Sequence, residues 1–333
     1  MNTSFCVSAT PHSTPMSSFL ICLLASLMAT STAFTFNKPP PFDSSTALVT
    51  GSTDGIGLTT AKNLAKKGYN VIIHGRNPER IQHAIDTVSS FDHISKEKIF
   101  SVESDISSLQ GCNNLVNQVQ SIIKSNNLSL DILMNNAGAF EGEHVLTDDN
   151  LETTFAVNVM APFVITSNLL PELLQKNNRQ SRVVIASSMS QCRGIDDWDD
   201  LQCMERPFST HRAYAESKLF DAILTAQIAT ILESNGFGSN RITCNSLDPG
   251  TVNTKMLLAG WGPIGIDVES ALDETWLCSS EEVSDTSGTY FCWKIKSKDR
   301  AAYKPSEREK LWKVLSDIDP SSASKWDKIH DFL

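Results

Sequence analysis

A tyrosine and a lysine four residues apart, in the run Tyr214-Ala-Glu-Ser-Lys218, are the side chains best suited to acid–base chemistry. On a helix this spacing places both on one face, with about 5–6 Å between their Cβ atoms. A free phenol has a pKa of about 10, and an ammonium beside it stabilises the phenolate and lowers that pKa. Lowering the pKa of the phenol to the neutral range requires about 4 kcal/mol of interaction that favours the phenolate over the phenol. The spacing also occurs between solvated neighbours, so its meaning depends on the rest of the chain.

The second feature is a glycine-rich turn upstream of this pair. The short apolar run Ala47–Val49 is followed by Gly51, Gly55 and Gly57, and a helical pattern then continues to Gly68. A strand, a glycine turn and a helix N-terminus together present backbone N–H groups and a positive dipole end to a pyrophosphate. Glycines allow the backbone to approach closely. The spacing Thr-Gly-x-x-x-Gly-x-Gly differs from the commoner G-x-G-x-x-G fingerprint, and a glycine cluster can also be an ordinary turn.

With these two motifs, residues 46–318 resemble the short-chain dehydrogenase/reductase family. Its further motifs follow in order: Asp105-Ile106, Asn135–Gly138, Asn158, Ser188 at the end of Arg182–Ser188, and Pro249–Thr254. A long acidic insert between Ser188 and Tyr214 and a helix at Leu311-Trp312 resemble the retinol-dehydrogenase-like branch. We interpret the acids of this insert as a solvated loop.

Apolar runs alternate with helical patterns along the chain, which predicts a parallel sheet with helices on both faces. We expect a single α/β domain with a Rossmann-type, doubly wound sheet of about seven strands. The expected strands are Ala47–Val49, Asn70–His74, Lys98–Glu103, Asp131–Met134, Arg182–Ala186, Arg241–Leu247 and Ser287–Phe291.

The resemblance implies hydride transfer between a nicotinamide and a carbonyl or alcohol carbon, with four catalytic residues. Tyr214 would exchange a proton with the substrate oxygen, and Ser188, rather than Ser187, would donate a hydrogen bond to it. Lys218 would lower the pKa of the tyrosine and bind the nicotinamide ribose. Asn158 would hold a water that relays protons, although it could also simply satisfy buried backbone groups.

The resemblance also implies a cofactor site made from the glycine turn and five later segments. Its residues are Gly51, Ser52, Thr53, Asp54, Gly55, Ile56, Gly57, Arg76, Asp105, Ile106, Asn136, Ala137, Gly138, Tyr214, Lys218, Pro249, Gly250, Val252 and Thr254. Enzymes that use NAD tend to place an acidic residue after the second strand. In this chain Gly75 occupies that position and is followed by Arg76, whose guanidinium can bind a 2′-phosphate. We therefore expect NADP(H), with NAD(H) as the alternative and Arg76 as a surface residue in that case.

Composition excludes several other classes. A net charge of −10 and a pI of about 5.2 argue against nucleic acid as a partner. The histidines and cysteines show no metal-ligand spacing, so we expect no metal site, and the cysteines beyond residue 100 read as small core residues.

The N-terminal segment predicts targeting. Residues 1–34 contain no charged side chain, and Phe19–Ala29 is apolar but shorter than the roughly 20 residues of a membrane span. Small residues at Ser31–Ala33 are typical of a signal-peptidase site, and Ala33-Phe34 resembles the junction of bipartite plastid presequences. We expect residues 1–33 to be a signal, 34–45 a linker or short transit segment, and 46–333 the enzyme domain. The localisation is then a plastid; the alternative is the endoplasmic reticulum or a membrane anchor.

Two apolar surfaces suggest partners. The segment Met256–Ile266 carries no charge. The resemblance implies that it lies over the nicotinamide as a lid, which predicts an apolar carbonyl or alcohol substrate. The alternative is that its apolar side chains simply fill the core beneath the lid. The helix from Tyr214 has two apolar stripes, one of which could form a homodimer or be covered by a neighbouring helix. A regulatory protein on the same fold and a sugar-nucleotide epimerase are the alternative functions. The complete catalytic set disfavours the first, and the glycine spacing disfavours the second.

Overall fold

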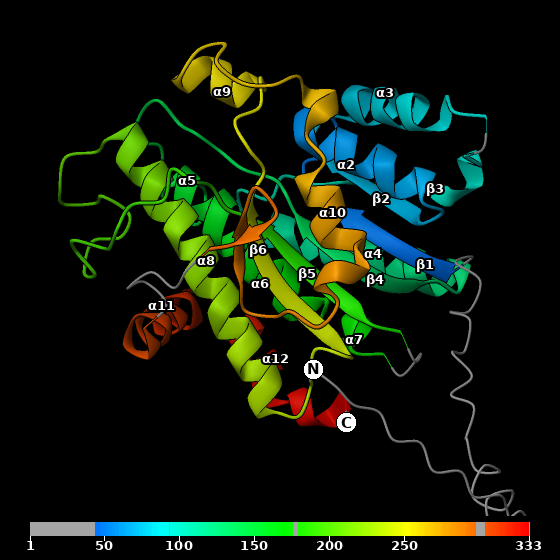
Figure 1. Cartoon of the computed structure of the whole chain (residues 1–333). Helices are drawn as coiled ribbons and strands as arrows, with labels where there is room; N and C mark the ends of the chain where they lie inside the picture. The colour runs from blue at the N-terminus through cyan, green and yellow to red at the C-terminus, as the bar shows by residue number, and fades with distance from the viewer. Residues whose placement is uncertain (1–43, 93, 176–178, 298–303, 333) are drawn as a thin grey trace, which may run out of the picture. The chain divides into compact units, whose positions relative to one another are not determined.

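The computed structural model describes residues 44–92, 94–175, 179–297 and 304–332 (Figure 1). The predicted signal at residues 1–33 and most of the predicted linker lie outside these residues. All the motifs of the predicted enzyme domain lie inside them.

Eight strands form one sheet in the order β3-β2-β1-β4-β5-β6-β7-β8. They are β1 Ser45–Val49, β2 Asn70–Gly75, β3 Ile99–Glu103, β4 Ser129–Asn135, β5 Ser181–Ala186, β6 Ile242–Asp248, β7 Tyr290–Cys292 and β8 Ile295–Lys296. Strands β1 to β7 pair in parallel, and β8 pairs antiparallel with β7. The predicted doubly wound α/β fold is confirmed, with a short eighth strand added at the edge.

Helices cover both faces of the sheet (Figure 1). The longer ones are α2 Gly55–Lys66, α3 Pro78–Ser89, α4 Leu109–Asn126, α6 Ala161–Asn168, α8 Thr210–Ser234, α10 Asp273–Ser279, α11 Pro305–Ile318 and α12 Pro320–Asp327. The shorter ones are α5 Thr153–Phe155, η3 Ala156–Met160, α7 Leu170–Leu173, α9 Lys255–Gly260, η2 Lys96–Lys98, η4 Val268–Ser270, η5 Glu281–Val283 and η7 Ile329–Phe332.

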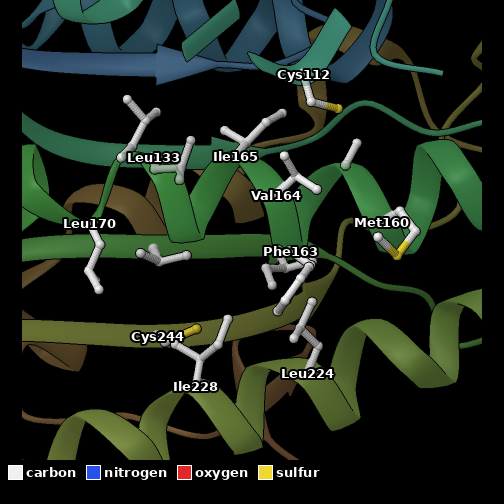
Figure 2. Close-up of a cluster of buried hydrophobic side chains, with 14 of the residues drawn as sticks. Cys112, Leu133, Met160, Phe163, Val164, Ile165, Leu170, Leu224, Ile228 and Cys244 are labelled. Carbon is white, nitrogen blue, oxygen red and sulfur yellow. The ribbon is translucent and has the colours of Figure 1, made fainter. Parts of the chain in front are cut away.

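Alternation along the strands divides the core into two layers. In β1, Leu48 belongs to the cluster formed with α4, α6, α8, α11 and α12, whereas Ala47 and Val49 belong to the cluster formed with α2, α3 and α10. Figure 2 shows part of the first layer, where Phe163 of α6 and Leu224 and Ile228 of α8 belong to one apolar cluster. Four cysteines are buried and Cys192 and Cys292 are half-buried, all six as free thiols.

Both apolar stripes of α8 are buried inside this chain. Leu219 and Phe220, one from each stripe, are 0% and 1% exposed. Helix α11 lies along α8 and contributes Leu311 and Leu315 to the same core cluster (Figure 1). The neighbouring-helix alternative therefore accounts for the second stripe, and α8 gives no support to a homodimer.

Because the strands are parallel, their carboxyl ends meet at one edge of the sheet, where ligands of this architecture bind. The glycine turn after β1, Arg76 after β2, Asn136 after β4, Ser188 after β5 and Pro249 after β6 all lie at this edge.

Candidate active site

Tyr214 and Lys218 lie side by side on the first turns of α8. The Nζ of Lys218 is 5.7 Å from the centroid of the tyrosine ring. Tyr214 is 8% exposed and Lys218 is 4% exposed, so the pair is not the solvated neighbour pair that the spacing alone allowed. The ammonium donates to the carbonyl of Ala186 at 2.7 Å and contacts Asp221 at 2.9 Å. The ammonium of Lys218 is therefore held against the end of β5.

The two serines after β5 have different roles. Ser187 is turned into the protein, where its hydroxyl donates to the carbonyl of Lys218 at 2.6 Å and accepts from Gln191 at 2.8 Å. The hydroxyl of Ser188 lies beside the phenol of Tyr214, where it acts to lower the pKa of that phenol. The structure thus places Ser188, and not Ser187, next to the phenol, and a hydrogen bond from Ser188 to a substrate stays a prediction.

Asn158 lies in the π-helical turn η3, a kind of helix defect often found at functional sites. Its amide accepts from the N–H of Ala139 at 2.7 Å and donates to the carbonyl of Ala139 and to Ser217. Ser217 in turn donates to the carbonyl of Tyr214. Asn158 therefore fixes the loop after β4 against α8, and its role as a water-holding residue stays a prediction.

The electrostatics of Tyr214 differ from the sequence expectation. Burial raises the pKa of this phenol, and the ammonium of Lys218 and the hydroxyl of Ser188 only partly oppose that effect. Burial alone would lower the pKa of Lys218, but Asp221 and Tyr214 outweigh it and raise that pKa. Without ligands, Tyr214 is therefore a protonated phenol beside a charged lysine.

The glycine loop, Thr50–Gly57, packs tightly against the segment after β4. A Cβ on Gly57 would lie 2.3 Å from Nδ2 of Asn136, and a Cβ on Gly51 would lie 2.9 Å from the Cα of Ala137. Gly51 and Gly55 also have φ values of +64° and +58°, which favour glycine. The first N–H groups of α2 have no acceptor within their own helix. This shape fits a pyrophosphate against the backbone.

His74 and Ser52 fix the glycine loop by hydrogen bonds. The sequence analysis did not assign this role to His74. The N–H of Gly51 donates to Nδ1 of His74 at 3.0 Å, and the other ring nitrogen contacts the carbonyl of Ser104. Burial lowers the pKa of His74 to about 4, which keeps the ring neutral and able to accept. The hydroxyl of Ser52 donates to Val49 at 2.7 Å, so this side chain holds the loop.

Arg76 lies at the end of β2 with its side chain 75% exposed, 3.7 Å from Asp105. Both residues thus stand together at the predicted adenosine end of the site. Gly75 has a packing reason of its own, because a Cβ there would lie 2.5 Å from Cγ2 of Thr53. The absence of an acidic side chain at position 75 is therefore required by the loop as well.

The segment after β6 closes the other side of the site. Thr254 caps α9 by accepting from the N–H of Leu257, and Val252 bridges to Ile266. The predicted lid, Met256–Ile266, is preceded by Lys255, whose ammonium forms an ion pair with Asp54 of the glycine loop. Gly138, another of the predicted cofactor residues, lies beside Lys218, since a Cβ added there would be 3.9 Å from its Nζ.

An aromatic cluster, which the sequence analysis did not predict, covers Tyr214. Phe140 and Trp261 contact Tyr214 with ring centroids 5.4 and 5.7 Å away, and they lie 4.8 Å from each other. His211 joins the cluster from the first turn of α8. A Cβ on Gly260 would lie 3.0 Å from the Phe140 ring, so this glycine permits the lid to approach.

Two kinds of feature are absent from the part of the chain that the structure describes. No group of three histidine, cysteine or acidic side chains is placed to hold a metal ion there. No helix in the same residues is long and apolar enough to cross a membrane.

The insert between Ser188 and α8 is more ordered than a solvated loop. Asp200 is buried and accepts from the N–H groups of Met204, Glu205 and Arg206. Arg206 then makes two hydrogen bonds to Glu216 on α8, two residues after Tyr214. The interpretation of Asp200 as part of a solvated loop was wrong, because its carboxylate is buried and organises the insert.

Comparisons with known proteins agree with this geometry. Human polyprenol dehydrogenase is 29% identical over 288 residues, which are 82% of this chain and 84% of that protein. Human retinol dehydrogenase 13 is 31% identical over 265 residues, covering 74% and 75%. The chloroplastic short-chain dehydrogenase TIC 32 A of Brassica napus is 26% identical, covering 80% and 86%.

Among solved structures, an uncharacterized protein from Mycobacterium paratuberculosis has the same fold, with a TM-score of 0.64 and 22% identity over 84% of this chain and 94% of that one. A 3-oxoacyl (acyl-carrier-protein) reductase from Agrobacterium tumefaciens with NADP bound has a TM-score of 0.58 and 25% identity, covering 75% and 93%. The family model for short chain dehydrogenases matches residues 45–259. The chain therefore belongs to the short-chain dehydrogenase/reductase family of oxidoreductases, in its retinol-dehydrogenase-like branch.

Proposed function

We propose that the protein is an NADP(H)-dependent oxidoreductase that interconverts an apolar carbonyl compound and its alcohol. The observation that carries this proposal is the convergence of Tyr214, Ser188 and Lys218 at the edge of the sheet that also holds the glycine loop. A regulatory protein on this fold would not need all three groups in contact.

The chain's own residues supply binding, orientation and proton transfer. In the reduction, the phenol of Tyr214 gives its proton to the developing alkoxide, and in the oxidation the phenolate takes one. Ser188 donates a hydrogen bond to the same oxygen and so stabilises its developing charge. A nicotinamide cofactor, held by the glycine loop, Asn136–Gly138 and Lys218, would supply or accept the hydride.

The preference for NADP(H) is supported by Arg76. Its guanidinium is exposed at the end of β2, and the one ion pair that it forms with the residues described is to a half-exposed carboxylate, so it is available for a 2′-phosphate. The related reductase from A. tumefaciens has NADP bound, which agrees with this assignment.

The apolar substrate is supported by the lid. None of the residues of α9 is buried, and Leu258, Ile264 and Ile266 are 48%, 67% and 44% exposed. These side chains therefore do not fill the core beneath the lid, which was the alternative explanation of the apolar segment. Relatives are named for retinol and polyprenol, both apolar alcohols.

Plastid localisation is proposed from the Ala33-Phe34 junction and from the relatives named chloroplastic. A fluorescent reporter fused to residues 1–45 should enter the plastid of an algal cell, and changing Phe34 to Ala should divert it. A reporter that reaches the plastid equally well without Phe34 would contradict the proposal.

The function is tested by incubating the full chain with NADPH and a panel of retinoids, straight-chain aldehydes and ketones, and one phosphorylated sugar as a charged control. We expect NADPH consumption with the apolar carbonyls and none with the sugar phosphate. Tight NADPH binding without turnover of any compound would favour the regulatory alternative.

A further inference from the structure

Asp221 is a buried carboxyl group one helical turn behind the catalytic lysine. Its Oδ2 lies 2.9 Å from Nζ of Lys218, and both side chains are buried, with 0% and 5% of their side-chain surface exposed. The other oxygen, Oδ1, has no hydrogen-bond partner within the described part of the chain. The ammonium's second contact is neutral, the carbonyl of Ala186. Asp221 is therefore the charged group in direct contact with Lys218.

Other titratable groups face this pair from three further directions, and each is held by another partner. Asp248 at the end of β6 accepts from the N–H of Met189 at 3.1 Å. Glu274 on α10 accepts from Thr60 at 2.8 Å. His211 packs in the aromatic cluster. Tyr214 is the remaining group, and its ring lies beside the ammonium.

The contact has a consequence for the phenol. An ammonium acts on Tyr214 through its uncompensated field, and a carboxylate 2.9 Å from that ammonium cancels part of the field. Asp221 accordingly raises the pKa of Tyr214, whereas Lys218 lowers it. The burial of both partners makes the cancellation stronger than it would be at the surface.

We propose that Asp221 is a positioning residue: it fixes the ammonium of Lys218 and, by offsetting its charge, makes the phenol of Tyr214 hold its proton more tightly. The phenol then stays protonated, the form that reduction of a carbonyl compound requires, up to a higher pH. This inference rests on the proposed function for its biological meaning, but the proton affinity of Tyr214 can be measured without any substrate.

The direct test is a spectroscopic titration of the full, cofactor-free chain. The sequence contains four tyrosines, so the phenolate absorbance of the parent minus that of Tyr214→Phe reports on one phenol. The same difference is measured in an Asp221→Asn background, where the amide oxygen still accepts from Lys218 but carries no charge. We expect the midpoint for Tyr214 to fall by about one pH unit.

Two further variants make the test robust. Asp221→Ser is smaller and neutral, and it should shift the midpoint in the same direction, so the result does not depend on Asp221→Asn folding. Asp131→Asn is the matched control, because Asp131 is a buried carboxyl in an ion pair with Arg179 near the start of β4, away from the site. It should leave the Tyr214 midpoint unchanged.

The pH dependence of turnover gives a second readout that a purely structural role would not move. In the reduction, the alkaline limb of the kcat/KM profile should shift to lower pH in Asp221→Asn. An unchanged or higher midpoint for Tyr214 in both neutral variants would overturn the inference, because it would show that Asp221 does not offset the charge of Lys218. A chain that turns over no carbonyl compound but shows the expected shift would contradict only the proposed function.

Discussion

Trp261 of the lid meets the ring of Tyr214 edge to face, with 5.7 Å between the centroids and 61° between the planes. An apolar side chain from the lid thus lies directly against the proposed proton donor, at the place where a substrate carbonyl must approach. We therefore expect the preference for apolar substrates to depend on Trp261.

Trp261→Ala should therefore affect long apolar substrates more than short ones. Losing about 60 Å² of apolar contact costs roughly 1.5 kcal/mol, which is about tenfold in kcat/KM. The measurement is kcat/KM along a series of straight-chain aldehydes. Ile295→Ala, which removes an exposed apolar side chain at the far edge strand, is the control and should change nothing. A flat series in the parent chain would mean that the lid does not bind the alkyl chain.

Arg76→Ala should weaken NADPH by about 1.5–3 kcal/mol and leave NADH almost unchanged, because only the 2′-phosphate loses a charge-assisted hydrogen bond. Dissociation constants from the quenching of tryptophan fluorescence would measure this. Arg193→Ala, an exposed arginine in the insert, serves as the control. Equal losses for both cofactors would show that Arg76 does not bind the phosphate.

His74 predicts a specific acid sensitivity. The pKa of its imidazole is about 4 in the folded chain against 6.5 in the unfolded chain, so only the unfolded chain takes up a proton between these values. The stability due to the neutral ring is complete above pH 6.5 and is lost as the pH falls to about 4, a loss of about 3 kcal/mol. His74→Asn keeps an acceptor for Gly51 without a titrating group. The parent's stability advantage over this variant, from urea unfolding, should shrink from pH 7 to pH 4; a constant difference would exclude the mechanism.

The ion pair between Arg206 and Glu216 should stabilise the insert and the catalytic helix together. Their side chains are 12% and 3% exposed, so Arg206→Ala leaves a buried carboxylate without its partner. We expect a loss of about 3 kcal/mol in the free energy of unfolding. Lys313→Ala removes one partner of an exposed pair with Asp317 and should cost no more than about 0.5 kcal/mol. Similar losses in the two variants would mean that burial of the Arg206 pair is unimportant.

The sequence predicted what depends on local spacing. The glycine loop, the Tyr214–Lys218 pair and seven of the strands follow from patterns within a few residues, and the structure has them close to the expected positions. The seventh strand is the least accurate of these predictions, since it spans Tyr290–Cys292 and not Ser287–Phe291. Strand β8 was missed because its hairpin turn uses Trp293 and Lys294 with φ values of 55° and 59°. Such turns usually contain asparagine or glycine, so these two residues gave no signal.

Other features were missed because they depend on contacts between distant segments. His74 supports a loop more than twenty residues earlier in the chain, and a single histidine in a strand carries no sign of that role. The burial of the second α8 stripe depends on α11, which follows α8 only after seven other described elements. Asp221 is only three residues from Lys218, but its effect on the tyrosine depends on burial that the local sequence does not fix.

The central claim is that Tyr214 transfers the proton, and the Tyr214→Phe variant tests it most directly. The substitution removes one hydroxyl and keeps the ring that packs against Phe140 and Trp261, so NADPH binding and the free energy of unfolding should stay close to the parent values. Turnover of the best apolar carbonyl should fall at least a hundredfold, since general acid catalysis contributes about 10²–10⁴. A Tyr214→Phe protein that binds NADPH and reduces the substrate near the parent rate would contradict the account.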